Sequence, residues 1–176
     1  MPTPPKRVES IEIVHPNAAG LDIGAREIYA CVPPDRAGET IKVFGTFTPD
    51  LAQLADWLVA HQDDTGRWDA YSFMKHGTSG EPAVGPGNAV HDVGVTSLAI
   101  LAMLGNGSTL RSGPYKESLK TATEWLRSQQ QENGLFGFNA SHDFIYDHAI
   151  AAYAICEAYG LSKYALLKPI AQKGLS

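Results

Sequence analysis

Two aspartates, Asp92 and Asp147, each stand beside a histidine at the start of a long apolar segment. His91 precedes Asp92, and His148 follows Asp147. Carboxylate and imidazole groups perform general acid–base chemistry, so Asp92, Asp147 and His148 are the candidate catalytic residues. The alternative role is structural, because a carboxylate in the first turn of a helix accepts hydrogen bonds from free backbone N–H groups and complements the helix dipole. The repetition favours the structural role, since a repeated residue usually serves the repeat.

The other reactive side chains are scattered along the chain. Cys31 and Cys156 lack the close spacing of a metal site, which favours two free thiols in a reducing cytoplasm. His142 and Asp143 are adjacent, but two neighbouring side chains in a loop are weak evidence for a metal site. The sequence contains no Gly-rich phosphate-binding loop and no G-x-S-x-G motif. No metal and no cofactor are therefore predicted.

The composition is that of a globular protein with a mild negative charge. The 176 residues include 14 Lys and Arg against 19 Asp and Glu, for a net charge of −5. Phosphate binding needs clustered basic residues, and none are clustered here, so nucleic acid is not an expected partner. The longest apolar stretch, residues 93–104, is shorter than the ~20 residues that span a bilayer, and the N-terminus lacks the apolar core of a signal peptide. We expect a cytoplasmic protein without a membrane span.

Strand patterns fill the first part of the chain and helix patterns the rest. The expected strands are Val8–Val14, Ala19–Ile23, Glu27–Val32 and Ile41–Phe47, rich in β-branched and aromatic residues and spaced as an antiparallel meander. Thr48, Pro49 and Asp50 have the residue types of a helix start. The expected helices run from there to about His61, and over His91–Leu104, Pro114–Gln130, Phe144–Tyr159 and Ser162–Leu175.

An internal repeat is the strongest pattern in the sequence. Residues 56–68 match residues 124–136, with each matched position 68 residues after its counterpart. The repeated residues, which we expect to be structural, are Trp57, Gln62, Gly66 and Trp68 in the first unit and Trp125, Gln130, Gly134 and Phe136 in the second. The apolar helices that follow match at a shorter offset of 55, which places an insertion in the Gly/Pro-rich loop of the first unit. The glycines suit a positive φ at a helix end, and the glutamines can bond freed backbone groups beneath the aromatic side chains.

This repeat resembles the QW-type repeat of the prenyltransferase and squalene-cyclase superfamily. The resemblance covers about residues 49–176 and extends to residues 73–76, 113–116 and 146–151. It implies a partial α/α toroid, in which the aspartates at the starts of the inner helices would line a cavity as an acid/base pair. The D-x-D-D acid of the cyclases and the Asp/Cys/His zinc pattern of the prenyltransferases are absent.

The N-terminal part resembles the start of the DEDD transposases of insertion sequences. Residues 15–24, 29–32, 44–48 and 54–58 carry the resemblance, and Asp22 matches the first metal-binding aspartate of their ribonuclease-H-like fold. The remaining carboxylates of that set have no counterpart, so Asp22 is expected to be a remnant. Two-metal cleavage needs several converging carboxylates, which a single aspartate does not supply.

The two resemblances together predict a chimera of class α+β. A small antiparallel β-meander, a truncated ribonuclease-H-like remnant, is expected over residues 1–48. A partial α/α toroid of about five helices is expected over residues 49–176. The joint falls within the helix at residues 49–61.

Three functions follow from this organisation, and the first is favoured. The first is a non-catalytic interaction protein that binds a protein partner through a partial toroid, with a homo-oligomer as one arrangement. The second is a terpenoid-cyclase or prenyltransferase-like enzyme, or a lipid-binding module, completed by oligomerisation. The third is a small acidic inhibitor or antitoxin of a nucleic-acid-acting protein, which only size and charge suggest. The incomplete carboxylate set and the absent D-x-D-D motif favour a protein that is not an enzyme.

The chain is predicted to show no nuclease or strand-transfer activity with Mg²⁺ or Mn²⁺, because Asp22 lacks partner ligands. Cleavage of labelled DNA and RNA substrates measures this directly. Metal-dependent cleavage that disappears in Asp22→Ala would contradict the prediction.

Overall fold

The computed structural model describes residues 20–23, 27–31, 41–45, 48–71, 88–139 and 142–176. The α-helices in these ranges are α1 (Thr48–Ala60), α2 (Asp92–Gly105), α3 (Lys116–Ser128), α4 (Phe144–Ser162) and α5 (Leu167–Gly174). A single 3₁₀ turn, η2 (Ala89–His91), leads into α2. No described helix is long and apolar enough to cross a membrane.

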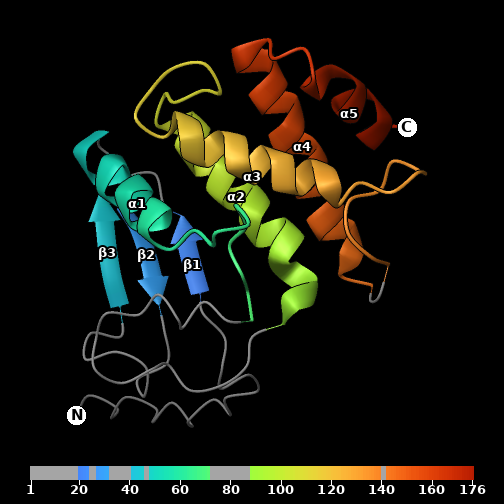
Figure 1. Cartoon of the computed structure of the whole chain (residues 1–176). Helices are drawn as coiled ribbons and strands as arrows, with labels where there is room; N and C mark the ends of the chain where they lie inside the picture. Colours follow the sequence, from blue (N-terminus) through green and yellow to red (C-terminus); the bar gives the residue numbers. More distant parts are fainter. Residues whose placement is uncertain (1–19, 24–26, 32–40, 46–47, 72–87, 140–141) are drawn as a thin grey trace, which may run out of the picture.

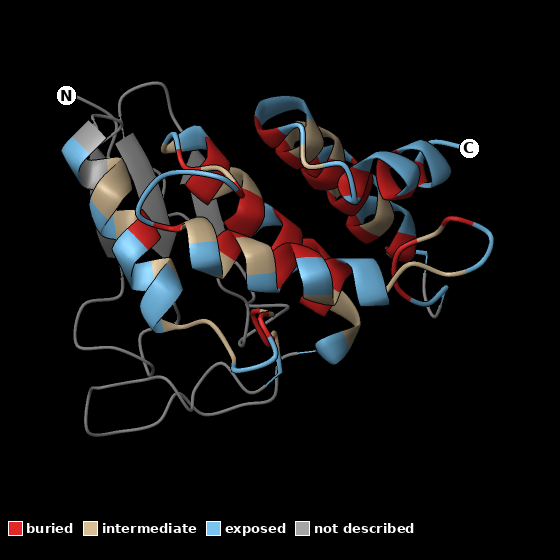
Figure 2. Ribbon diagram, turned by 45° about the horizontal axis from the view of Figure 1, so that its top comes forward, coloured by how far each residue is buried: buried red, intermediate tan, exposed pale blue. Residues whose placement is uncertain are grey.

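Helices α2 and α4 form the centre of the molecule and run side by side in the same direction (Figure 1). Helices α1 and α3 pack against α2, and α5 packs against α4. Figure 2 shows the buried residues between the helices and many exposed residues on the outward sides of α1 and α3. The largest fully buried side chains include Phe136, Ile100, Met103, Leu119, Leu126 and Ile155, which join four of the segments in one apolar core. Burial of such side chains contributes about 1.5–3 kcal/mol each.

The sequences of the helices match how they are buried. Helix α3 places Leu119, Ala122 and Leu126 on one buried side and polar residues on the other, as a surface helix does. Helices α2 and α4 are apolar around most of their circumference, which suits helices with neighbours on more than one side. Packing therefore sets the pattern of each helix.

The end of α4 differs from the expected one. The helix was expected to stop at Gly160, but it continues to Ser162 and ends where Lys163 adopts a left-handed φ of 50°. Arg111 accounts for this extension, because its Nε donates to the carbonyl of Ser162 at 2.6 Å and its Nη2 to that of Lys163 at 3.3 Å. These bonds satisfy carbonyl groups that a helix end leaves free. As a result α5 begins at Leu167 rather than at Ser162.

Three short strands precede the helices. They are β1 (Gly20–Ile23), β2 (Glu27–Cys31) and β3 (Ile41–Gly45), paired antiparallel in the order β1-β2-β3. Tyr29 of β2 pairs with Asp22 on one side and with Val43 on the other. Helix α1 contacts β3.

The expected α+β class is wrong, because the described structure is mainly helical. The apolar core of the part of the chain that the structure describes lies in the helices and the turns that join them. The strands are four or five residues long and form only a narrow ladder, and the expected strand Val8–Val14 lies outside the described residues. Three short strands bury too little apolar surface to build a core, whereas the helices bury theirs against one another. The packed body of the protein is helical.

Deletion of residues 1–46 is predicted to leave a folded helical protein, because the described core begins at Ala55. Circular dichroism should show retained helix and a cooperative thermal transition, with the full-length chain as the reference. An insoluble fragment, or one without a transition, would mean that the N-terminal segment is part of the core.

Candidate functional site

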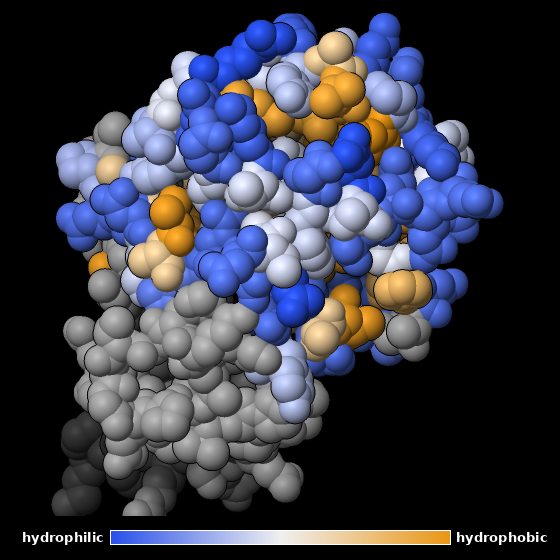
Figure 3. Space-filling model, in the orientation of Figure 1, coloured by the Kyte–Doolittle hydropathy of each residue, from blue (hydrophilic) through white to orange (hydrophobic). Residues whose placement is uncertain are grey.

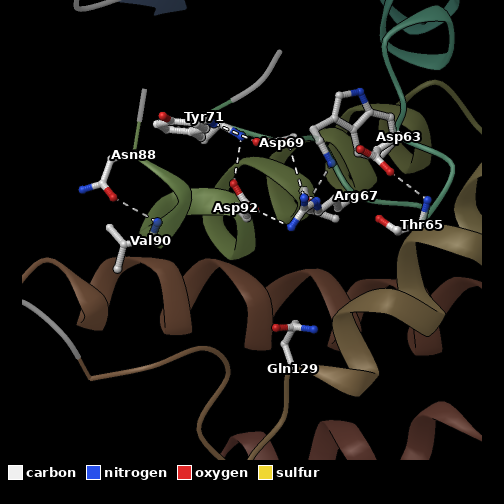
Figure 4. A network of polar contacts seen from close by, with 12 residues as sticks. Asp63, Thr65, Arg67, Asp69, Tyr71, Asn88, Val90, Asp92 and Gln129 are labelled. Atoms are coloured by element: carbon white, nitrogen blue, oxygen red, sulfur yellow. Dashed lines mark hydrogen bonds and ion pairs between the residues drawn. The ribbon is translucent and has the colours of Figure 1, made fainter. Parts of the chain in front are cut away.

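A cluster of charged side chains lies where α2 begins (Figure 4). Asp92, the first residue of α2, is buried, and its Oδ1 accepts a hydrogen bond from the backbone N–H of Ala70 at 2.8 Å. Its Oδ2 lies 3.0 Å from Nη1 of Arg67. These contacts attach the turn that follows α1 to the start of α2.

Arg67 also binds a second carboxylate. Its Nη2 lies 3.3 Å from Oδ2 of Asp69, whose Oδ1 accepts the backbone N–H of Tyr71 at 2.9 Å. Burial raises the pKa of Asp92, while the Ala70 hydrogen bond and Arg67 act in the opposite direction. Two buried carboxylates thus share one guanidinium, and removal of that cation would leave uncompensated buried charge.

Asp147 joins α4 to the start of α2. It lies in the first turn of α4, and its Oδ2 is 3.1 Å from Nδ1 of His91. Its other oxygen lies directly over Gly94, where an added Cβ would overlap it. The two central helices approach closely at this point because residue 94 has no side chain.

His148 serves the second repeat turn. Its Nδ1 accepts the backbone N–H of Phe136 at 3.2 Å, and its ring stacks with those of Phe136 and Phe144 at centroid distances of 6.0 and 6.1 Å. Burial lowers the pKa of His148, which favours the neutral imidazole that this acceptor role requires. The side chain is therefore held by the turn rather than presented to a substrate.

The three catalytic candidates are each engaged in internal contacts. Asp92 binds Arg67, Asp147 binds His91, and His148 binds the backbone of Phe136. A groove of about 500 Å³ opens elsewhere, beside α3, and none of the three lines it. Its lining residues are Thr65, Leu110, Lys120, Thr121, Thr123, Glu124, Trp125, Arg127, Ser128, Tyr164, Leu166 and Leu167. These three side chains hold helices and turns together, and their contacts do not bring them to one common point.

The metal candidates are also dispersed. Within the described ranges no group of three or more His, Cys, Asp or Glu residues could hold a metal ion. His142 Nε2 lies 3.0 Å from Oδ1 of Asp143 in an exposed position. The backbone of Asp22 lies in β1, and its side chain is outside the described residues. Cys156 is a free, half-buried thiol whose pKa burial raises, so it is a weak nucleophile.

The first repeat turn docks on α3. Gln62 Nε2 donates to the carbonyl of Gly66 at 2.8 Å, closing the turn, and to that of Ser118 at 3.1 Å. Gly66 has a φ of +95°, and a Cβ there would overlap the carbonyl of Thr121. Both a left-handed backbone and a close approach thus require glycine at this position.

The second repeat turn makes the same contacts with α5. Gln130 Nε2 donates to the carbonyl of Gly134 at 3.1 Å and to that of Ile170 at 3.0 Å. Gly134 has a φ of +90°, and a Cβ there would overlap the carbonyl of Lys173. In each unit one glutamine closes its own turn and fastens it to the second α-helix after that turn, α3 for Gln62 and α5 for Gln130.

The aromatic repeat positions fall into two classes. Trp68 and Phe136 are buried, and Trp68 Nε1 donates to the carbonyl of Leu58 at 2.8 Å. Trp57 is 49% exposed and stacks on the neighbouring His61, whereas Trp125 is half-buried and lines the groove beside α3. The two tryptophans of the helices therefore do not share one structural role.

Sequence reasoning missed Arg67 and Gly94. Arg67 aligns with Leu135 in the second unit, so the repeat gave no signal for a cation at that position. Gly94 aligns with Ala149, and a glycine inside an apolar helix was the available signal for a close approach of another segment.

Comparison with known proteins returned no match: no family model, no curated protein and no solved structure matches the chain. The resemblances to the QW-type repeat and to the DEDD transposases rest on the residues quoted for them, and they stay predictions.

Gln130→Ala is predicted to lower the free energy of unfolding by about 1–3 kcal/mol, because the carbonyl groups of Gly134 and Ile170 would lose their donor. Gln129→Ala is the matched control, since that side chain bonds only the exposed hydroxyl of Ser128 and its loss should cost less than about 0.5 kcal/mol. Urea denaturation of both variants measures the difference. Equal free energies of unfolding for the two variants would show that the hydrogen bonds of Gln130 do not stabilise the fold.

Proposed function

We propose that the protein is a non-catalytic binding protein, built on a partial α/α-toroid scaffold, that holds a protein partner on one face of its two central helices. The supporting observation is the kind of residue that these helices leave exposed. Val95 and Leu98 on α2 are 38% and 52% exposed, and Tyr146 and Tyr153 on α4 are 67% and 56% exposed. We call these four residues the α2/α4 face.

The α2/α4 face is a continuous surface by the geometry of the helices. Leu98 and Tyr153 are equivalent positions, 55 residues apart, on helices that lie side by side and run in the same direction. Tyr146 precedes Tyr153 by seven residues, and such residues share one face of a helix. Exposed apolar side chains gathered in this way mark interaction sites.

Helix α3 provides the contrast within the same molecule. Its exposed positions are Glu117, Thr121, Glu124, Arg127 and Ser128, all polar. Figure 3 shows the α3 side as mainly hydrophilic, with its apolar side chains in separate groups. Polar residues outside are the normal pattern for a helix at the surface, and α2 and α4 depart from it, as α1 does at Trp57 and Val59.

The charges of α2 and α4 indicate what kind of partner fits. Helix α2 contains only Asp92 and helix α4 only Asp147 and Glu157 as charged residues; the two aspartates are buried and Glu157 is half-buried. Neither helix contains Lys or Arg, which disfavours nucleic acid at this face. The cores of protein interfaces are likewise depleted of charge and enriched in tyrosine. A protein partner in the cytoplasm fits this composition.

A lipid-binding module or terpenoid-cyclase-like enzyme is the second candidate, because the same apolar face would line a closed cavity if further helices completed the toroid. Asp92 is paired with Arg67 and Asp147 with His91, which supports the binding function over the enzyme.

Leu98→Glu is predicted to abolish partner capture, because a carboxylate would have to be buried in the interface. Leu166→Glu is the matched control: Leu166 is 57% exposed, against 52% for Leu98, and lines the groove beside α3 instead. Affinity capture from the source cells with quantitative mass spectrometry compares the variants with the unaltered protein. Capture that survives Leu98→Glu, or that both variants lose equally, would contradict the assignment of the face.

A further inference from the structure

We propose that the partner of the α2/α4 face is a second copy of the same chain, bound with the α4 helices of the two copies antiparallel across a two-fold axis. This inference rests on the proposed function, of which it names the partner.

The first argument is the charge of the chain. A two-fold interface places each surface patch against its own image, so any charged residue near the axis meets a like charge. With a net charge of −5, close contact between two copies is favoured where the surface around the axis is uncharged. The exposed residues of α4 are all uncharged: Ile145, Tyr146, Ala149, Tyr153, Gly160 and Leu161. Glu157 is half-buried and is the one carboxylate beside this stripe within α4 that is not buried.

The second argument is the alternation of large and small side chains. Tyr146, Ala149, Tyr153 and Gly160 follow one another along a single face of α4 at helical spacing. A two-fold axis midway between Ala149 and Tyr153 places the ring of Tyr153 of each copy over Ala149 of the other. At this pair of positions the surface is complementary to itself, as an isologous interface requires. The phenol groups can keep their hydroxyls in water at the edge while the rings are covered.

The third argument is the area available. Six large apolar side chains of α2 and α4 are more than a third exposed: Val95, Leu98, Ile145, Tyr146, Tyr153 and Leu161. Since a fully buried aromatic side chain covers about 150–250 Å², these six offer roughly 500 Å² per copy. Two copies would bury about 1,000 Å² together, which lies at the lower limit of specific interfaces. The expected dimer is therefore weak and concentration-dependent.

Sedimentation equilibrium of the full chain over a range of concentrations tests the inference. The average mass of the unaltered protein should rise from that of a monomer towards twice that value. Tyr153→Glu and Ala149→Glu should each weaken the dimer by at least about tenfold, the effect of a charge in the centre of an interface. Leu166→Glu adds the same charge outside the face and should leave the dissociation constant unchanged. Circular dichroism of each variant verifies that its helices are retained.

Two results would overturn the second copy as partner. One is that the unaltered protein stays monomeric at the highest concentrations, whether or not it binds phosphatidylcholine vesicles. The other is a dimer that both Tyr153→Glu and Ala149→Glu leave intact. A monomer whose capture of another protein is still lost in Leu98→Glu would overturn this inference and leave the proposed function in place. A dimer that is lost in Tyr153→Glu and Ala149→Glu and kept in Leu166→Glu supports this inference and the proposed function.

Discussion

The close approach of α2 and α4 at Gly94 is the constraint on which the rest of the structure depends. The carboxylate of Asp147 occupies the space that a side chain at residue 94 would fill, and its other oxygen binds His91 at the entry to α2. The two central helices are thereby brought into register near their N-terminal ends. Helices α1 and α3 pack on α2, and α5 packs on α4, so the other described helices are arranged around this central pair. The adjacent Asp92, held by Arg67, ties the preceding turn to the same place.

The two repeat turns hold the outer helices α3 and α5 in place. In each turn one glutamine donates to two carbonyl groups, one within the turn and one in the second α-helix after it. A single side chain therefore both closes the turn and holds that helix against it. The aromatic side chains of the same turns, Trp68 and Phe136, are buried in the core. Chemistry-bearing residues are thus used for assembly, while the exposed surface of α2 and α4 stays apolar and uncharged.

Local patterns predicted the helices well and the fold class poorly. The apolar periodicity and the residues Thr48, Pro49 and Gly105 located α1 and α2 to within a residue or two, since these signals depend on neighbouring residues only. The fold class was wrong because β-branched composition predicts a strand but not how much of the packed protein the strands form. The end of α4 was missed because it depends on Arg111, 51 residues away from Ser162. The role of Asp147 likewise required the neighbour that packing brings to it, Gly94, which no spacing in the sequence reveals.

The two repeat units differ at one equivalent position, which is Gly94 in the first unit and Ala149 in the second. Position 149 is the counterpart of position 94, but it carries a methyl group and is exposed. An aspartate could not enter there as Asp147 enters over Gly94, so the two units are not interchangeable modules. An arc lengthened by copying the second unit end to end would inherit this methyl group at every new junction. A designed extension that reuses the contact between Gly94 and Asp147 would need glycine at residue 149.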